Sequence, residues 1–290
     1  MSHNPIGLST FTLASPFTTA DGAQFDHVAS LGFEVIEVCI EAPQLLSAEW
    51  LAEQAARTGL TVGICGAFGP DRDISSEDPA VRASARAYLT YCIDTAQIVG
   101  SALVAGPMYA TTGVTRMLDD ADRAAQRARA ADGLRELADY AAERGVGLAI
   151  EPLNRFETDL INTTRQGLEL CELIGRENVG LLIDTFHMNI EEQGIGDAVR
   201  AAGDRVFHVQ VSENDRGTPG SGHVPWDEFF GALGDIDYRG QIVIESFLPT
   251  VKEIARAVSL WRPVAPSMHA LAVDGLAFVR AQLGQNGTEG

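Results

Sequence analysis

Four oxygen-bearing side chains stand at the ends of short apolar segments of this sequence: Glu151, Asp184, Gln210 and Glu245. If these segments are neighbouring parallel strands, their carboxyl ends meet at one place and the side chains point to a common centre. Carboxylates brought this close repel one another, and their pKa values rise unless a cation lies between them. Oxygen ligands suit Mn²⁺, Mg²⁺ or another hard divalent ion, and they argue against structural zinc. The pattern therefore indicates a metal-assisted active site.

Each of these residues has an ordinary interpretation when it is taken alone. A single carboxylate after a strand often caps a helix or lies in a solvated loop, but four residues at successive strand ends favour a shared site. Gln210 has two interpretations. It is either a metal ligand, or a hydrogen-bonded neighbour of the site, in which case His208 points into the site instead. His208 and Gln210 share one face of their strand, because side chains alternate. Glu37, on an earlier strand, either orients a ligand or is a buried structural acid.

Further polar residues lie close to these positions in the sequence. Glu157, His187 and Arg216 each follow one of the strand-end residues by a few positions. His187 is either a site residue or a satisfied loop histidine, and Arg216 is either a site residue or half of a surface ion pair. Cys65 stands at the end of a predicted strand, and Tyr109 stands in the loop after another, so both are additional candidates for the lining of the site.

The elements that carry these residues can be predicted from the apolar pattern. Apolar and β-branched runs predict eight strands, at 6–13, 33–40, 60–67, 102–105, 146–150, 178–183, 206–211 and 241–244. Amphipathic or capped segments predict the helices, at 24–31, 48–57, 79–99, 122–144, 164–174 (capped by Thr163 or Thr164), 195–202, 226–233 and 250–283, the last interrupted near Pro263 and Pro266.

This alternation of strands and helices predicts an α/β chain with the architecture of a (β/α)8 TIM barrel. No linker or change of composition divides it, so we predict a single domain over 1–290, with extra C-terminal helices and a flexible polar tail at 285–290. A doubly wound sheet is the alternative, but no glycine-rich phosphate loop follows the first strand.

Composition restricts the classes of function. The net charge of −19 repels phosphate backbones and anionic membranes, so roles on nucleic acids and membrane surfaces are discounted. No apolar run approaches the ~20 residues that span a bilayer, and the first residues lack the basic and apolar regions of a signal peptide. The four cysteines form no CxxC pair, and most lie in apolar stretches, which predicts reduced core thiols. A cytoplasmic protein is therefore expected.

Several longer segments resemble one family of barrels. Most of the chain is similar to the xylose-isomerase-like barrels, and within them to the D-tagatose and D-allulose (D-psicose) 3-epimerases of the sugar isomerase/epimerase group. The segments that carry the resemblance are Arg72-Asp-Ile-Ser-Ser-Glu-Asp-Pro-Ala-Val-Arg82, Gly106-Pro-Met-Tyr109, Glu151-Pro-Leu-Asn-Arg-Phe-Glu-Thr158, Asn162-Thr163, Asp184-Thr-Phe-His-Met-Asn-Ile-Glu191, Ser212-Glu-Asn-Asp-Arg-Gly217, Pro219-Gly-Ser-Gly222 and Ile244-Glu-Ser-Phe247.

The resemblance implies a divalent-metal-dependent ketose 3-epimerase that acts on a small sugar and forms a homodimer or homotetramer. It implies one metal ion, Mn²⁺ or alternatively Mg²⁺ or Co²⁺, with its ligands at Glu151, Asp184, the seventh-strand position and Glu245. It also implies substrate contacts, from Glu157, His187 and Arg216. One position departs from the pattern, because ketose 3-epimerases usually carry histidine where this chain has Gln210. The related hydroxypyruvate isomerases carry glutamine there, so the departure concerns the substrate more than the metal.

The implied chemistry is proton transfer at C3 through a cis-enediolate. Inversion at C3 requires one base on each face of that plane, and Glu151 and Glu245 are the two candidates for catalysis. Three alternatives remain open: a hydroxypyruvate-isomerase-like aldose–ketose isomerase, a lyase or isomerase acting on 3-oxo-glycosides, and a sugar-binding barrel without catalysis. The last is disfavoured, because binding alone does not require a base on each face.

Overall fold

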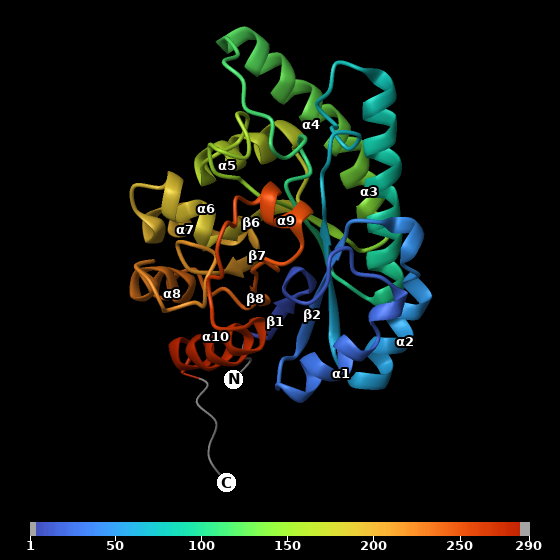
Figure 1. Cartoon of the computed structure of the whole chain (residues 1–290). Helices are drawn as coiled ribbons and strands as arrows, with labels where there is room; N and C mark the ends of the chain where they lie inside the picture. The colour runs from blue at the N-terminus through green and yellow to red at the C-terminus, as the bar shows by residue number, and fades with distance from the viewer. Residues whose placement is uncertain (1–3, 285–290) are drawn as a thin grey trace.

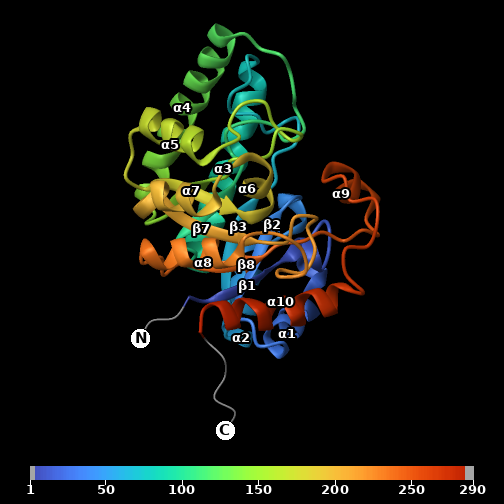
Figure 2. The same ribbon diagram turned by 90° about the vertical axis from the view of Figure 1, so that its left-hand side faces the viewer.

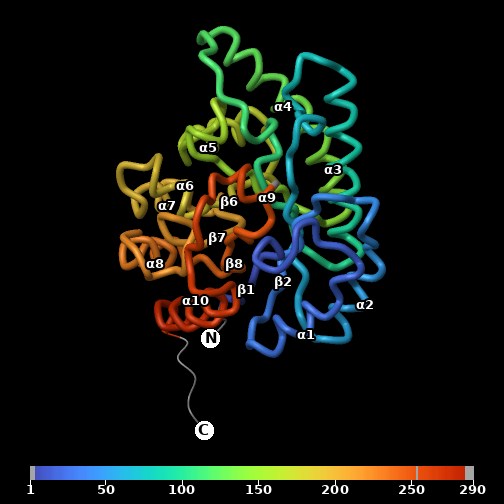
Figure 3. Tube along the Cα trace, viewed as in Figure 1, coloured from blue at the N-terminus to red at the C-terminus, as the bar shows by residue number. Residues whose placement is uncertain are grey.

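The structure, a computed structural model, describes residues 4–284. Within this range eight parallel strands close into a barrel, each pairing with the next and β8 pairing with β1. The strands are β1 (Ile6–Ser9), β2 (Val35–Ile40), β3 (Thr61–Gly66), β4 (Leu103–Gly106), β5 (Gly147–Ile150), β6 (Val179–Asp184), β7 (Val206–Val211) and β8 (Ile242–Ile244). Figure 1 shows the helices around this barrel, and the tube in Figure 3 follows the chain once around it. The predicted (β/α)8 architecture is confirmed.

Ten α-helices lie among the described residues, and several begin and end where the sequence predicts. They are α1 (Ala23–Ser30), α2 (Ala48–Thr58), α3 (Pro79–Val99), α4 (Asp120–Ala142), α5 (Thr164–Ile174), α6 (Thr185–Glu191), α7 (Ile195–Ala202), α8 (Trp226–Asp235), α9 (Lys252–Ala257) and α10 (Met268–Gln282). At the start of α3 the side chain of Asp78 accepts an N–H from Ala80, with Pro79 as the first helical residue. Gly100 ends the same helix at φ 75°, a left-handed conformation that glycine adopts without strain.

The core has two parts, because strand side chains alternate between the helices and the barrel interior. Side chains that face the helices, such as Ile36, Val38 and Ile40 of β2, belong to the large apolar layer between strands and helices. A smaller interior cluster contains short side chains, among them Cys39, Cys65, Ala105 and Ala149. Both layers are fully formed only when the barrel closes, so the strand ends are held in fixed positions.

Three local details differ from the sequence-based expectation. The first strand is shorter than 6–13, because the Ser9 side chain accepts an N–H from Phe11 and a 3₁₀ turn begins at Thr10. The segment after Asp184 forms the helix α6, which was not predicted. The C-terminal region contains two separate helices. Since α10 packs against β1 and β8, it is the barrel helix that follows β8, and α9 is an additional helix. Figure 2 shows α9 in the connection between β8 and α10.

Two further expectations concern the ends of the chain and membranes. The predicted polar tail, 285–290, lies outside the described residues. Within residues 4–284 no helix is both long and apolar enough to cross a membrane.

Candidate active site

The four strand-end residues lie at the carboxyl ends of β5 to β8, as the sequence predicts. Glu151 directly follows β5, and its N–H donates to Gly106 O at 3.2 Å. Glu245 directly follows β8, and its N–H donates to Val211 O at 3.1 Å. Asp184 ends β6 and pairs in register with Gln210 of β7. All four residues are buried, with exposures of 5% or less.

Arg216 connects two of these carboxylates. Its Nη1 donates to Asp184 Oδ2, and to Glu245 Oε2 at 3.0 Å. The guanidinium lies over the rings of Phe186 and Phe247, at 4.2 and 5.1 Å from their centroids. Arg216 itself has φ 64°, a left-handed conformation that is unfavourable for a side chain of this size. Strained backbone of this kind is typical of functional sites, and the surface ion-pair interpretation of Arg216 is wrong.

His187 lies on α6, not in a loop, and its imidazole contacts Glu151 and Arg216 of the same group. Its Nδ1 accepts the backbone N–H of Asn154 at 3.0 Å, so the proton of the neutral ring is on Nε2. Nε2 lies 3.4 Å from Glu151 Oε1 and 2.9 Å from Arg216 Nη2. Two nitrogen atoms that carry N–H groups therefore lie next to each other, and a substrate oxygen that reaches them could accept from either.

Sequence reasoning assigned no role to Asn154, which links Glu157 to His187. Its Nδ2 donates to Glu157 Oε1 at 2.8 Å, while its backbone N–H contacts the imidazole. Glu157 is half-buried, at the edge of the group. The available signal was local: Asn154 lies between Glu151 and Glu157 in the loop after β5. The helix α6 was also missed. Its N-cap is Asp184, which was read only as a site residue but also accepts the Phe186 N–H at 2.7 Å.

The electrostatics of the site favour an additional cation. Burial raises the pKa of Glu151 and raises that of Glu245 well above its ordinary value, and in both cases nearby carboxylates add to the effect. Among the described site residues Arg216 is the one cation set against the carboxylates of Glu151, Asp184 and Glu245. A divalent ion would balance the remaining negative charge.

The donor atoms also fit such an ion. Carboxylate oxygens of Glu151 and Asp184 lie within 4.8 Å of each other, and His187 faces both with its Nε2–H rather than as a metal ligand. Gln210 Oε1 is buried and has no hydrogen-bond partner among residues 4–284. Buried acceptors are normally satisfied, so an unpaired amide oxygen on the residue that pairs in register with Asp184 suits a hard divalent cation.

The remaining candidates lie in the barrel interior or in its wall. His208 shares the face of Gln210, as predicted, but its Nε2 contacts Glu37 Oε2 at 2.5 Å. Cys65 is 3% exposed at the end of β3, and contact with Cys39 together with burial raises its thiol pKa. Tyr109 is buried, and its hydroxyl donates to Ile161 O at 3.0 Å, which gives it a structural contact.

A closed (β/α)8 barrel with three buried carboxylates and one buried amide at four successive strand ends defines a class of enzymes that act on small molecules at the barrel mouth. Residues 25–279 match the family model described as xylose isomerase-like TIM barrel, and the chain belongs to this family. It is 35% identical over 275 residues to a D-psicose 3-epimerase of Agrobacterium fabrum, covering 91% of this chain and 93% of the relative.

Solved structures agree with the sequence comparison. The structure of an L-ribulose 3-epimerase superimposes with a TM-score of 0.91 at 32% identity, covering 97% of this chain and 95% of that one. A D-allulose 3-epimerase from Methylomonas sp., in complex with D-allulose, superimposes with a TM-score of 0.90 at 28% identity, covering 97% of this chain and 98% of that one. The predicted resemblance to ketose 3-epimerases is confirmed, and with it the predicted isomerase class.

Proposed function

We propose that this chain is a divalent-metal-dependent ketose 3-epimerase whose substrate is a free ketose. The observation that carries the proposal is the pair of buried glutamates, Glu151 and Glu245, at the ends of β5 and β8 in a chain whose relatives are named ketose 3-epimerases. Both have raised pKa values, as acid–base catalysts near neutral pH require.

Four residues would hold the metal: Glu151, Asp184, Gln210 and Glu245. When bound, a divalent ion such as Mn²⁺, or alternatively Mg²⁺ or Co²⁺, would act as a Lewis acid that stabilises negative charge developing on the sugar. The unpaired oxygen of Gln210 and the excess of carboxylates over guanidinium support this assignment. Glutamine therefore supplies an oxygen ligand at the position where the resemblance implies histidine.

The two glutamates would perform the proton transfers. One of them, as carboxylate, takes the proton of C3, and the electrons of the C3–H bond form the C2–C3 double bond while charge develops on the C2 oxygen. The other, as carboxylic acid, returns a proton to C3 from the opposite face, which inverts that carbon. Each turnover exchanges the protonation states of Glu151 and Glu245, so the same pair serves the reverse reaction.

The polar residues beside them would orient the sugar. The neighbouring N–H groups of His187 and Arg216 would donate to oxygens at the C1–C2 end. Glu157, held by Asn154, would accept from a substrate hydroxyl or maintain the orientation of the His187 loop. Correct placement matters, because a shift of about 1 Å in a bound substrate can cost about a hundredfold in rate.

The relevant assembly would be a homodimer or homotetramer. Trp261 is 75% exposed in the segment before α10 and Phe156 is 73% exposed in the loop after β5, and large exposed apolar side chains are typical of interfaces. Light scattering of the purified chain measures this directly, and a monomer at micromolar concentration contradicts it.

The experiment that tests the function is C3 proton exchange in D₂O. The protein, loaded with Mn²⁺, is incubated with D-fructose or D-tagatose, and both the deuterium content at C3 and the epimer are measured. Exchange together with epimer formation is expected. Exchange without an epimer would favour the isomerase or lyase alternatives, and the absence of exchange with any ketose would overturn the proposal.

A further inference from the structure

The carboxylate of Glu37 lies inside the barrel and contacts a strand that is not its neighbour. Glu37 belongs to β2, and β1 and β8 separate β2 from β7. Its Oε1 accepts the Nε2–H of Gln210 at 2.6 Å, and its Oε2 lies 2.5 Å from Nε2 of His208. All three side chains are at most 1% exposed. A carboxylate at this depth needs hydrogen-bond donors, and both of its oxygens receive them from β7.

This contact determines which end of the Gln210 amide faces the active site. An ionised carboxylate only accepts hydrogen bonds, so it selects the NH₂ end of the amide. The oxygen then occupies the other position, where it is buried and has no partner among residues 4–284. If the amide were reversed, the oxygens of Gln210 and Glu37 would face each other at 2.6 Å. The NH₂ group would then take the position of the ligand oxygen, and it has no lone pair to offer a metal ion.

We propose that Glu37 is a positioning residue for the metal site: it holds the amide of Gln210 so that its oxygen is presented as a ligand. The inference deepens the proposed function and rests on it, because it takes Gln210 as a metal ligand. Groups behind the first ligands commonly orient them in this way, and their removal weakens metal binding by about 10- to 100-fold. Glu37 touches neither substrate nor metal in this role.

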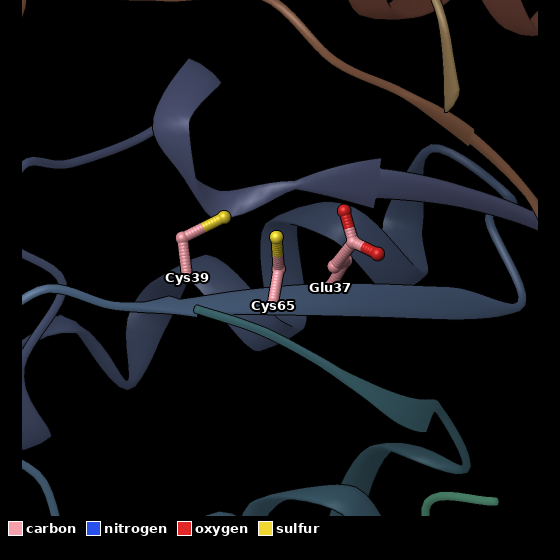
Figure 4. A group of neighbouring side chains, drawn as sticks. All are labelled: Glu37, Cys39 and Cys65. Atoms are coloured by element: carbon pink, nitrogen blue, oxygen red, sulfur yellow. The ribbon is translucent and has the colours of Figure 1, made fainter. Parts of the chain in front are cut away.

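A competing role for Glu37 is a second metal site with two thiols. Figure 4 shows Glu37, Cys39 and Cys65 with their side chains on the same side of the strands that carry them, and single ligand atoms of the three lie within 4.8 Å of one another. However, both oxygens of Glu37 already accept hydrogen bonds from β7. Thiols bind metals as thiolates, whereas burial raises the pKa of Cys39 and contact with Cys39 raises that of Cys65. The contacts therefore assign Glu37 to Gln210.

The same geometry accounts for the exchange between glutamine and histidine at this position. An imidazole, like an amide, offers one N–H and one lone pair. A carboxylate behind it would take the N–H and direct the lone pair forward, as Glu37 does for the amide of Gln210. The Gln210→His variant is therefore expected to bind Mn²⁺ within about tenfold of the unsubstituted protein, and to remain sensitive to substitution of Glu37.

The test is Mn²⁺ binding to chelator-stripped protein without sugar, followed by the electron paramagnetic resonance signal of free Mn²⁺. Glu37→Gln has the same shape but no longer selects one end of the Gln210 amide, and it should weaken binding by about 10- to 100-fold. Glu37→Asp keeps the charge but is one methylene too short, and should weaken binding by about tenfold. Glu34→Gln, just before β2, is the matched control for loss of one negative charge and should leave binding unchanged.

A double-substitution cycle separates orientation from charge and from damage to the fold. Gln210→Ala should weaken Mn²⁺ binding by about as much as Glu37→Gln, and adding either substitution of Glu37 to Gln210→Ala should change it by less than about twofold. If a Glu37 substitution weakens Mn²⁺ binding as much in the Gln210→Ala variant as in the unsubstituted protein, the positioning role is overturned. Glu37 would then act through its charge or through the fold. Binding unaffected by both Glu37 variants would also overturn it. Absence of Mn²⁺ binding in the unsubstituted protein would instead overturn the proposed metal site, and this role with it.

Discussion

The two halves of the barrel end in different kinds of side chain. The last inward-facing side chains of β1 to β3 are uncharged: Ser9, Cys39 and Cys65. These groups satisfy one another, as in the contact of 3.3 Å between Ser9 Oγ and Cys39 Sγ. The strands β5 to β8 carry the four proposed oxygen ligands instead, and Arg216 and His187 contact the three carboxylates among them. Glu37 is the exception in the first half, and it reaches across to β7.

The difference shows which part of the barrel carries the buried charges that lower the stability of the fold. Buried charges destabilise a fold unless they are paired, yet the second half keeps several of them, with raised pKa values, in one place. The first half contributes packing inside the barrel, and the carboxylate that follows β2, Glu41, accepts the hydroxyl of Ser15. Substitutions in the second half should therefore affect activity far more than stability, and substitutions in the first half should do the reverse.

The largest effect is expected for Glu151→Gln and Glu245→Gln. Each variant keeps the size of the side chain but removes one acid–base group, so epimerisation should fall by about 10²- to 10⁴-fold. Steady-state rates measured in both directions, with circular dichroism to confirm the fold, test this expectation. Substantial epimerisation by either variant would contradict an acid–base role for that glutamate, and with it the assignment of the chemistry to the second half of the barrel.

The same two variants can show which face each glutamate serves. With one base left, a variant should still exchange the C3 proton of one epimer with solvent while failing to produce the other epimer. The two variants should differ in the epimer that exchanges. If both variants exchange the same epimer, Glu151 and Glu245 do not act on opposite faces.

A smaller effect is expected for Arg216→Lys. Lysine keeps the charge, but one ammonium group cannot replace a planar guanidinium that contacts Asp184, Glu245 and His187 together. The loss of a hydrogen bond to a charged group, about 1.5–3 kcal/mol, corresponds to about 10- to 100-fold in kcat/KM. Arg262→Lys is a matched control, because Arg262 is exposed and pairs with Asp215 outside the site. Equal losses in the two variants would contradict a special role for Arg216.

The raised pKa of Glu245 predicts a pH-dependent effect on stability. In the metal-free protein, ionisation of this buried carboxyl lowers stability, and the loss grows as pH rises above the ordinary pKa of 4.5 until the raised pKa is passed. Glu245→Gln cannot ionise there. In the presence of chelator it should therefore unfold at a higher temperature than the unsubstituted protein at pH 8, and the difference should shrink toward pH 5. Calorimetry at several pH values measures this, and a difference independent of pH would contradict it.

Much of this arrangement could be predicted from the sequence because the signals were local. Asp78 before Pro79 and Gly100 after the helix set the bounds of α3, which were predicted correctly. Carboxylates placed after apolar runs identified the strand ends, since parallel strands in a barrel bring these ends together. Contacts within one segment or one strand were therefore accessible to sequence reasoning.

The remaining features depend on contacts between distant segments. The left-handed conformation of Arg216 and its two carboxylate partners depend on the closed barrel. Glu37 could be described only as an orienting or a structural acid, because its partners lie 171 and 173 residues away. Asn154 was overlooked because its role depends on the position of His187, which α6 provides.

The smallest effect is expected for Cys65→Ala, which tests the first half of the barrel. The variant removes one buried atom, so it should cost about 1 kcal/mol of stability and change kcat by less than about threefold, since no acid–base group is lost. Cys92→Ala is the matched control, because Cys92 is equally buried but lies on α3 outside the barrel. If Cys65 lines the sugar site, KM rises in the first variant only. A tenfold fall in kcat for Cys65→Ala would show that β3 takes part in the chemistry. It would contradict the assignment of packing to the first half of the barrel and of activity to the second.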